Sequence, residues 1–197
     1  MSDIIYPTPA IVRETSMGLS TVRICDDMFA HREIEIVGTV DEVMTYSLCQ
    51  QLRQLQREDP MGRITIFFNS PGGEVQSGLA IYDTMRAIGC PIRTVCLGMA
   101  ASMAALLFIA GDERLMLPHA RVLIHDPLIG GGVSGSALEL KTVAEQIMRT
   151  REITAEVIAR HTGHSLEEVY EKTRVDSWFE APDAVAWGLA DKVIDRL

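Results

Sequence analysis

Cysteine is scarce in this sequence, and its spacing excludes the usual disulfide and metal frameworks. The 197 residues include four cysteines, with no CxxC pair and no spacing typical of metal ligands. Three of the four have apolar neighbours, so buried free thiols are expected rather than disulfides. This usage suits a reducing compartment, and we expect a cytoplasmic protein with no metal and no other cofactor.

Basic residues and long apolar runs are also in short supply. The 18 Lys and Arg residues against 27 Asp and Glu residues give a formal net charge of -9, which argues against nucleic acid or an anionic membrane as the main partner. No apolar run approaches the length of a membrane span. The first ten residues lack the basic and apolar regions of a signal peptide. The sequence has no GxxxxGK[ST] and no GxGxxG, so a nucleotide site is not expected.

What the chain does contain is an alternation of strand and helix patterns, over a length that suits one domain. Strand-like apolar runs over 33–37, 64–68 and 92–97 are separated by helical patterns over 41–58 and from Val75 to Met85. This order predicts parallel strands joined by right-handed crossovers. The fold class is therefore α/β.

Three S/T-x-x-E patterns mark expected helix starts. They begin at Thr39, Ser136 and Ser165, and the second opens a helical pattern that runs to residue 162. A helix of that length cannot be buried by one layer of its own subunit, so we expect it to project and to pack against another subunit. Residues 1–32 read as an irregular arm, and Gly130–Gly132 as a flexible stretch.

Ser102 lies where a strand-like run meets an apolar helical run that begins at Met103. The residues two positions away on either side are Ala100 and Ala104. A nucleophilic serine on a sharp strand-to-helix turn needs small residues at those places. Most serines at such joins only cap the helix, so the local pattern alone leaves both interpretations open.

A serine nucleophile needs a base, and His125 is the best placed of the five histidines. It follows the apolar strand 122–124, and the carboxyl end of a central strand is a common place for a site in an α/β fold. A histidine satisfied within the core is the alternative. His161 and His164 flank a helix end at Gly163, where imidazoles commonly bond free carbonyls.

The residues alone do not select the acid that would orient this base. Asp126 follows the candidate base directly, and adjacent strand residues face opposite ways, so it is expected to point away from the candidate nucleophile. Asp176 lies in a polar turn and is the better candidate. Composition does not separate it from Asp183 or Asp191.

Backbone N–H groups that could hold an oxyanion are expected at two places. The Gly72-Gly73 turn follows a buried strand and is free to adopt positive φ. The N–H of Met103 begins a helix directly after Ser102, at the positive end of the helix dipole.

Five sequence blocks, in order, resemble the ClpP family, the serine peptidase subunits of the Clp protease. The blocks are NSPGGEV at 69–75, GLAIYDTM at 78–85, GMAASMAA at 98–105, RVLIHDPL at 121–128 and TRVDSWFEAPDAVAWGLADKV at 173–193. The similarity covers about residues 9–197.

This resemblance implies a role for each candidate site residue. Ser102 would be the nucleophile, His125 the general base and Asp176 the acid that orients His125. The backbone N–H groups of Gly73 and Met103 would be the oxyanion donors.

The resemblance also implies a crotonase-like ClpP fold of repeated ββα units. The chain would then divide into an N-terminal arm over 1–32 and a single peptidase domain over 33–197. A projecting handle helix would lie within about 126–162.

An assembly and partners are implied in the same way. Such proteins form two stacked seven-subunit rings, a tetradecamer that encloses a chamber and serves protein quality control. An ATP-driven Clp unfoldase, ClpX or a ClpA/ClpC relative, docks on the ring face and delivers unfolded polypeptides. Residues 127–134 would hold the substrate backbone as an added strand. Neither nucleic acid nor a membrane is implied as a partner.

Several positions depart from the family pattern. Val175 stands where an arginine usually precedes the acid, and that arginine is associated with contact between rings. Asp126 replaces a usual glutamine, and Ala104 a usual glycine. Residues 17–25 lack the usual RGER segment and the tyrosines of the arm. These departures affect the pairing of rings and the docking of an unfoldase.

Three other functions stay open at this point. The chain could be a dormant or regulatory ring subunit that needs a second ClpP-type partner, an acyl-CoA hydratase or isomerase of the crotonase fold, or a scaffold without chemistry. The surroundings of Ser102 and His125 have no role in a hydratase. Retention of all three triad residues argues against an inactive chain.

Overall fold

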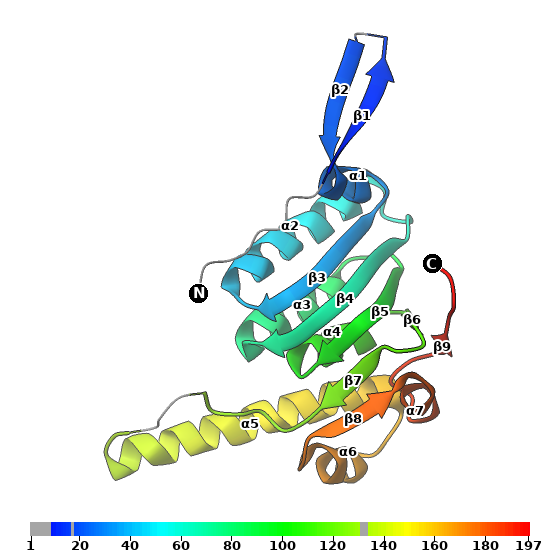
Figure 1. Ribbon diagram of the computed structural model, residues 1–197. Helices are drawn as coiled ribbons and strands as arrows, with labels where there is room; N and C mark the ends of the chain where they lie inside the picture. The colour runs from blue at the N-terminus through cyan, green and yellow to red at the C-terminus, as the bar shows by residue number, and fades with distance from the viewer. Residues whose placement is uncertain (1–8, 17, 131–133) are drawn as a thin grey trace.

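Strands and helices alternate through most of the chain. The structure, a computed structural model, describes residues 9–16, 18–130 and 134–197. A seven-stranded mixed sheet forms the body, a two-stranded hairpin extends from one end of it, and a long helix projects at the other end (Figure 1). Of the stretch predicted to be flexible, only Gly130 lies within the described residues.

The first described residues form regular structure, so the prediction of an irregular arm is wrong here. Strand β1 (Ala10–Thr15) pairs antiparallel with β2 (Gly18–Arg23), and helix α1 (Ile24–Ala30) follows. Nearly every side chain of the hairpin is exposed, so neither strand shows the apolar alternation by which a strand is recognised in a sequence. Backbone hydrogen bonds between the two strands hold the hairpin together instead.

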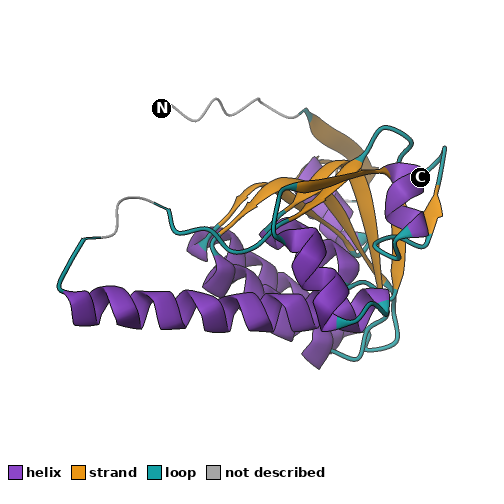
Figure 2. Ribbon diagram, turned by 90° about the horizontal axis from the view of Figure 1, so that it is seen from below, coloured by secondary structure: helices purple, strands orange, loops and turns teal. Residues whose placement is uncertain are grey.

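The centre of the molecule follows the predicted alternation. Five elements succeed one another: β3 (Glu33–Val40), α2 (Glu42–Glu58), β4 (Ile64–Gly73), α3 (Val75–Ala87) and β5 (Ile92–Ala101). The three strands pair in parallel, in chain order, which confirms the predicted parallel strands. Most of the helices lie on one face of the sheet (Figure 2).

Strands β4 and β5 run further than their apolar cores predicted. The backbone pairing of β4 continues through the glycine turn, up to Gly73, and that of β5 continues to Ala101. The predicted helix start at Thr39 is wrong because strand β3 also continues further than its apolar run. Thr39 still pairs with β4, and Asp41 is the N-cap, its carboxylate accepting the Met44 N–H at 2.8 Å.

Strand β5 belongs to two halves of the sheet. Four further strands complete the sheet: β6 (Glu113–Met116), β7 (Arg121–Ile124), β8 (Ser177–Glu180) and β9 (Lys192–Val193). The first half of β5 pairs with β6, and its last three residues, Met99–Ala101, pair with β7. Strand β8 lies antiparallel along the other side of β7. This division brings the ends of β5 and β7 together.

Helix α4 (Met103–Ile109) is the centre of the core. All seven of its residues are buried, and the Phe108 ring meets Phe68 of β4 edge to face at 5.8 Å. Each large side chain buried there contributes roughly 1.5–3 kcal/mol of hydrophobic stabilisation. The strand-to-helix junction at Ser102 is therefore anchored on its helical side.

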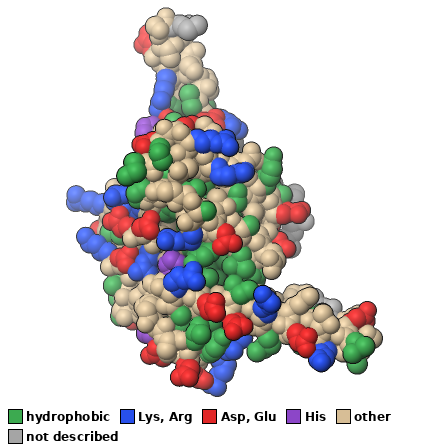
Figure 3. Space-filling view, turned by 180° about the vertical axis from the view of Figure 1, so that it is seen from behind, with side chains coloured by type: hydrophobic (Ala, Val, Ile, Leu, Met, Phe, Trp, Pro, Cys, Tyr) green, Lys and Arg blue, Asp and Glu red, His purple; other side chains and the backbone are tan. Residues whose placement is uncertain are grey.

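The C-terminal third contains the long helix and two short ones. Helix α5 (Ala137–Thr162) and α6 (Leu166–Thr173) both begin with the predicted capping boxes, at Ser136 and Ser165, and α7 (Ala181–Ala186) follows β8. The buried residues of α5 all lie within 154–158. Its first turns project beyond the body (Figure 1), and charged side chains of both signs lie along them with scattered apolar ones (Figure 3).

Candidate active site

Ser102 occupies a strained backbone conformation between β5 and α4. Its φ of 53° and ψ of -122° make it one of two non-glycine residues with positive φ in the described ranges. Its N–H donates to Leu123 O of β7 at 2.9 Å. Its side chain makes no capping hydrogen bond, so the helix-cap interpretation fails. Strain of this kind is held in place by surrounding structure and is common at active sites.

His125 lies beside this serine because β5 and β7 are paired. Ala101 is opposite Leu123, so the residues that follow each strand emerge at one edge of the sheet. His125 Nε2 is 2.7 Å from Ser102 Oγ, and the imidazole is 13% exposed. A nucleophile and a base at hydrogen-bond distance can begin acyl transfer.

Of the three candidate acids, the structure brings Asp176 to His125. Asp176 Oδ1 lies 3.3 Å from His125 Nδ1, which is buried and has no hydrogen-bond partner among the described residues, although the carboxylate itself is 68% exposed. The contact is an ion-pair distance and not a hydrogen bond. Asp191 instead bonds Arg114, and Asp183 lies in the first turn of α7.

The glycine turn at the end of β4 lies against the start of α4. Gly72 has a φ of 90°, and a Cβ on it would be only 2.9 Å from Met103 N. The Gly72 N–H donates to Ser70 Oγ at 3.1 Å, and that hydroxyl donates to Gly38 O at 2.5 Å. Ser70, which sequence reasoning missed, thus fixes the turn. The N–H groups of Gly73 and Met103 stay the candidate oxyanion donors.

Comparison with known proteins identifies the family. A family model described as Clp protease matches residues 16–197. This chain belongs to the Clp protease family. A curated relative, the ATP-dependent Clp protease proteolytic subunit of Porphyromonas gingivalis (strain ATCC BAA-308 / W83), is 37% identical over 193 residues, which cover 97% of this chain and 86% of the relative.

Family membership settles the type of enzyme. The chain is a serine peptidase of the Clp type, with the α/β ClpP fold that the resemblance implied. The match supports the proteolytic subunit and favours neither the hydratase nor the scaffold. Sequence reasoning alone left these alternatives open.

The histidines of α5 and of the turn that follows it have structural partners in this Clp-family peptidase. His161 Nε2 lies 2.9 Å from the Tyr82 hydroxyl. Its burial, together with the nearby positive charges, lowers its pKa to about 4. The predicted carbonyl contact is therefore wrong for His161, whereas His164 donates to Trp187 O at 3.2 Å and stacks on the Trp187 ring.

Asp126 points away from Ser102, as predicted. Its carboxylate accepts hydrogen bonds from Arg151 of α5 and Thr173 of α6. Both partners are distant in sequence, so no local pattern could have indicated them.

No metal or membrane feature was found in the part of the chain that the structure describes. Within those residues, no group of three or more His, Cys, Asp or Glu side chains is arranged to hold a metal ion. No helix there is long and apolar enough to cross a bilayer. All four cysteines are free, and burial raises the pKa of the Cys96 thiol to about 12.

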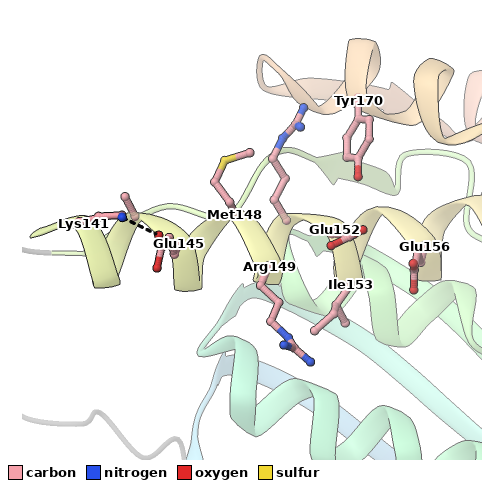
Figure 4. Close-up of a pocket in the computed structure, with 10 residues that line it drawn as sticks. Lys141, Glu145, Met148, Arg149, Glu152, Ile153, Glu156 and Tyr170 are labelled. Atoms are coloured by element: carbon pink, nitrogen blue, oxygen red, sulfur yellow. Dashed lines mark ion pairs between the residues drawn. The ribbon is translucent and has the colours of Figure 1, made fainter. Parts of the chain in front are cut away.

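A groove of about 840 Å³ lies along α5 and does not include the candidate site. Charged side chains such as Glu152 and Arg149 line it together with Met148 and Ile153, and Tyr170 of α6 closes one side (Figure 4). Neither Ser102, His125 nor Asp176 is among the residues that line it.

Proposed function

We propose that Ser102, His125 and Asp176 are the catalytic triad with which this Clp-family peptidase cleaves peptide bonds in unfolded polypeptides. The observation that carries the proposal is the 2.7 Å separation of Ser102 Oγ and His125 Nε2. The strained backbone of Ser102 supports it, because the hydroxyl is turned out of the helix-cap position.

The chemistry follows from these positions. Ser102 Oγ attacks the scissile carbonyl carbon while His125 Nε2 takes the hydroxyl proton and then gives it to the leaving amine. Asp176 faces the other ring nitrogen and stabilises the protonated imidazole. A water molecule, activated by the same imidazole, hydrolyses the acyl-enzyme and releases Ser102.

The negative charge that develops on the substrate carbonyl oxygen needs hydrogen-bond donors close to Ser102. We assign this role to the backbone N–H groups of Met103 and Gly73. Met103 N is the first amide of α4, and the first amides of a helix have no partner within it. Gly73 is the last residue of β4, next to Gly72, where an added Cβ would lie 2.9 Å from Met103 N.

The substrate is proposed to lie as an extended strand beside the segment that follows His125. In the described part of this segment, Leu128 and Ile129 are exposed apolar residues, 76% and 46%. They are available for contact with an unfolded chain. Residues 131–133, which the sequence analysis included, lie outside the described residues.

For the assembly we propose two stacked seven-subunit rings that receive substrates from a Clp-type ATPase, ClpX or a ClpA/ClpC relative, in the cytoplasm. The projecting part of α5 supports contact between subunits, because Leu138, Leu140 and Met148 are exposed on it. Native mass spectrometry of the purified chain would give the subunit number. A monomer at physiological concentration would contradict the ring.

A fluorophosphonate probe tests the triad directly. We expect the probe to label the wild-type chain at Ser102, and expect Ser102→Ala to abolish both labelling and peptide hydrolysis with the fold intact. Ser47→Ala, a change at an exposed serine of α2, is the control and should label normally. Labelling of Ser102→Ala at the wild-type rate would show that another residue is the nucleophile.

A further inference from the structure

The two sequence neighbours of His125 hold the two ends of the segment that carries Asp176. Ile124 is paired with Ser177, the first residue of β8. Asp126 donates its N–H to Thr173 O, the last residue of α6, at 2.8 Å. Only residues 174–176 lie between these two attachments.

The attachment at Thr173 is made by a side chain as well as by backbone. Asp126 Oδ1 accepts a hydrogen bond from the Thr173 hydroxyl at 2.6 Å, and Thr173 is 3% exposed. Asp126 Oδ2 accepts a second one from Arg151 Nε, also at 2.6 Å. Short, partly buried hydrogen bonds to a charged group are stronger than exposed ion pairs.

Arg151 is itself held in place by α6. Its guanidinium carbon lies 4.0 Å from the centre of the Tyr170 ring, and Figure 4 shows that ring facing α5. Asp126, after the end of β7, bonds Arg151 of α5; Arg151 packs on Tyr170 of α6; and Thr173 at the end of α6 bonds Asp126 again. These contacts form a closed ring of interactions. A closed ring of interactions resists movement of the C-terminal end of α6 relative to His125.

Asp176 depends on these attachments because its own surroundings provide little support. Its side chain is 68% exposed, and Val175 before it is 63% exposed. Arg174 pairs with exposed Glu171, at 3.7 Å, rather than with the site. With 3.3 Å between Asp176 Oδ1 and His125 Nδ1, a small shift of the segment changes the contact.

We propose that Asp126 is a positioning residue: through Thr173 and Arg151 it sets the distance between Asp176 and His125. The proposal rests on the triad proposed above and adds to it a residue that touches neither substrate nor the reacting atoms. It also gives a role to a position where the family usually has glutamine.

The first experiment compares Thr173→Val with Thr173→Ser in peptide hydrolysis. Valine keeps the shape of the buried side chain and loses the hydroxyl, whereas serine keeps the hydroxyl and loses a methyl group. We expect Thr173→Val to lower kcat about 10-fold with little change in KM, since displacement of a catalytic group is costly. Thr173→Ser should stay close to wild type. The opposite order would show that Thr173 serves packing alone and would overturn the proposal.

The second experiment is a double-mutant cycle with Asp176. Asp126→Asn keeps an acceptor for Thr173 but loses the ion pair, so we expect an intermediate loss of kcat in the otherwise wild-type chain. In the Asp176→Asn background the same change should have almost no further effect, because the two residues act in series. Additive losses would overturn the proposal. Glu171→Gln, an exposed change on α6, is the control and should leave kcat unchanged.

These outcomes separate this proposal from the triad itself. If Ser102→Ala and His125→Ala are inactive while Asp126→Asn and Thr173→Val match wild type, Asp126 has no positioning role and the triad stands. If Ser102→Ala retains full activity, the triad is wrong and the positioning of its acid falls with it.

Discussion

His125 Nδ1 and Asp176 Oδ1 lie 3.3 Å apart without a hydrogen bond, whereas His125 Nε2 is within 2.7 Å of Ser102 Oγ. The proposed base is therefore at hydrogen-bond distance from the proposed nucleophile, whereas its contact with the proposed acid is looser. The acid is also the most exposed member of the three. If the proposed roles hold, the contact between His125 and Asp176 is the one that must shorten for the triad to be complete.

Val175 is the residue through which we expect this contact to depend on assembly. Its exposed apolar side chain stands beside Asp176 and cannot donate the hydrogen bonds of the arginine usual in the family. We predict weak peptidase activity for the purified chain alone. Val175→Arg should raise kcat at least about 5-fold, the low end of a typical coupling between sites, and should increase the double-ring fraction in sedimentation velocity.

Leu197→Arg controls for the added charge, because Leu197 is exposed at the C-terminus. It should change neither activity nor sedimentation. If the wild-type chain alone is already a fully active double ring, Val175 is a neutral substitution and this prediction is wrong.

The triad residues should act as one unit in mutant kinetics. We predict that His125→Ala lowers kcat nearly as much as Ser102→Ala, by several orders of magnitude, and that combining the two changes adds little. Asp176→Asn should cost less than His125→Ala, because its carboxylate is exposed and lacks a hydrogen bond to the ring. Asp183→Asn removes an acid on α7 that does not face His125, and it should be silent. A large loss of kcat in Asp183→Asn together with a small loss in Asp176→Asn would show that Asp183, and not Asp176, orients His125.

Gly72→Ala tests the oxyanion side of the site. The new methyl group would lie 2.9 Å from Met103 N and 2.5 Å from Ala101 O, at a residue whose φ is +90°. We predict a loss of about 100-fold in kcat, similar to removal of one oxyanion donor. The kcat is to be normalised to the fraction of folded protein, which circular dichroism measures. Gly89→Ala has at least 3.7 Å to its nearest neighbour and should keep wild-type activity. Wild-type activity in Gly72→Ala would place the oxyanion elsewhere.

His161 predicts a pH dependence of stability. Its folded pKa of about 4 lies below the ordinary 6.5, chiefly because of burial and then because of Arg86 and Arg114. The unfolded chain therefore takes up a proton first as the pH falls. The contribution of neutral His161 to the free energy of unfolding is therefore fully present above pH 6.5 and declines as the pH falls from 6.5 toward 4.

A variant without this imidazole isolates the effect. Between pH 7 and pH 5, the melting temperature of His161→Gln should fall less steeply than that of wild type, and glutamine can still accept from Tyr82. His119→Gln, at an exposed histidine, should follow the wild-type curve. Parallel curves for wild type and His161→Gln would mean that His161 does not titrate differently on folding.

The elements with strong periodicity were the ones that the sequence predicted well. The helices over 41–58 and 136–162 were predicted within a residue or two, because apolar spacing and caps are local signals. The β1–β2 hairpin was missed because its side chains are exposed on both faces. The extension of β4 to Gly73 was missed because strand pairing there depends on β3 and not on side-chain pattern.

The site was predictable in part for a similar reason. Ser102 and His125 each follow a recognisable strand, so the sequence placed both at carboxyl ends of strands, but it did not predict the pairing of β5 with β7 that brings them together. Asp176 follows a helix in a polar turn, and its choice over Asp191 depended on the family resemblance. The contacts of Asp126 with Arg151 and Thr173 involve partners 25 and 47 residues away, which local sequence does not reveal.

The place of β8 in the chain also has a consequence for biosynthesis. Translation releases β5, α4 and β7 first, so the serine and the imidazole leave the ribosome before residues 173–180 exist. A nascent chain then lacks both the acid and the edge strand that flanks β7. On the proposed roles, the site is completed only after residues 173–180 have been made. We therefore expect nascent chains that end before residue 173 to lack hydrolytic activity.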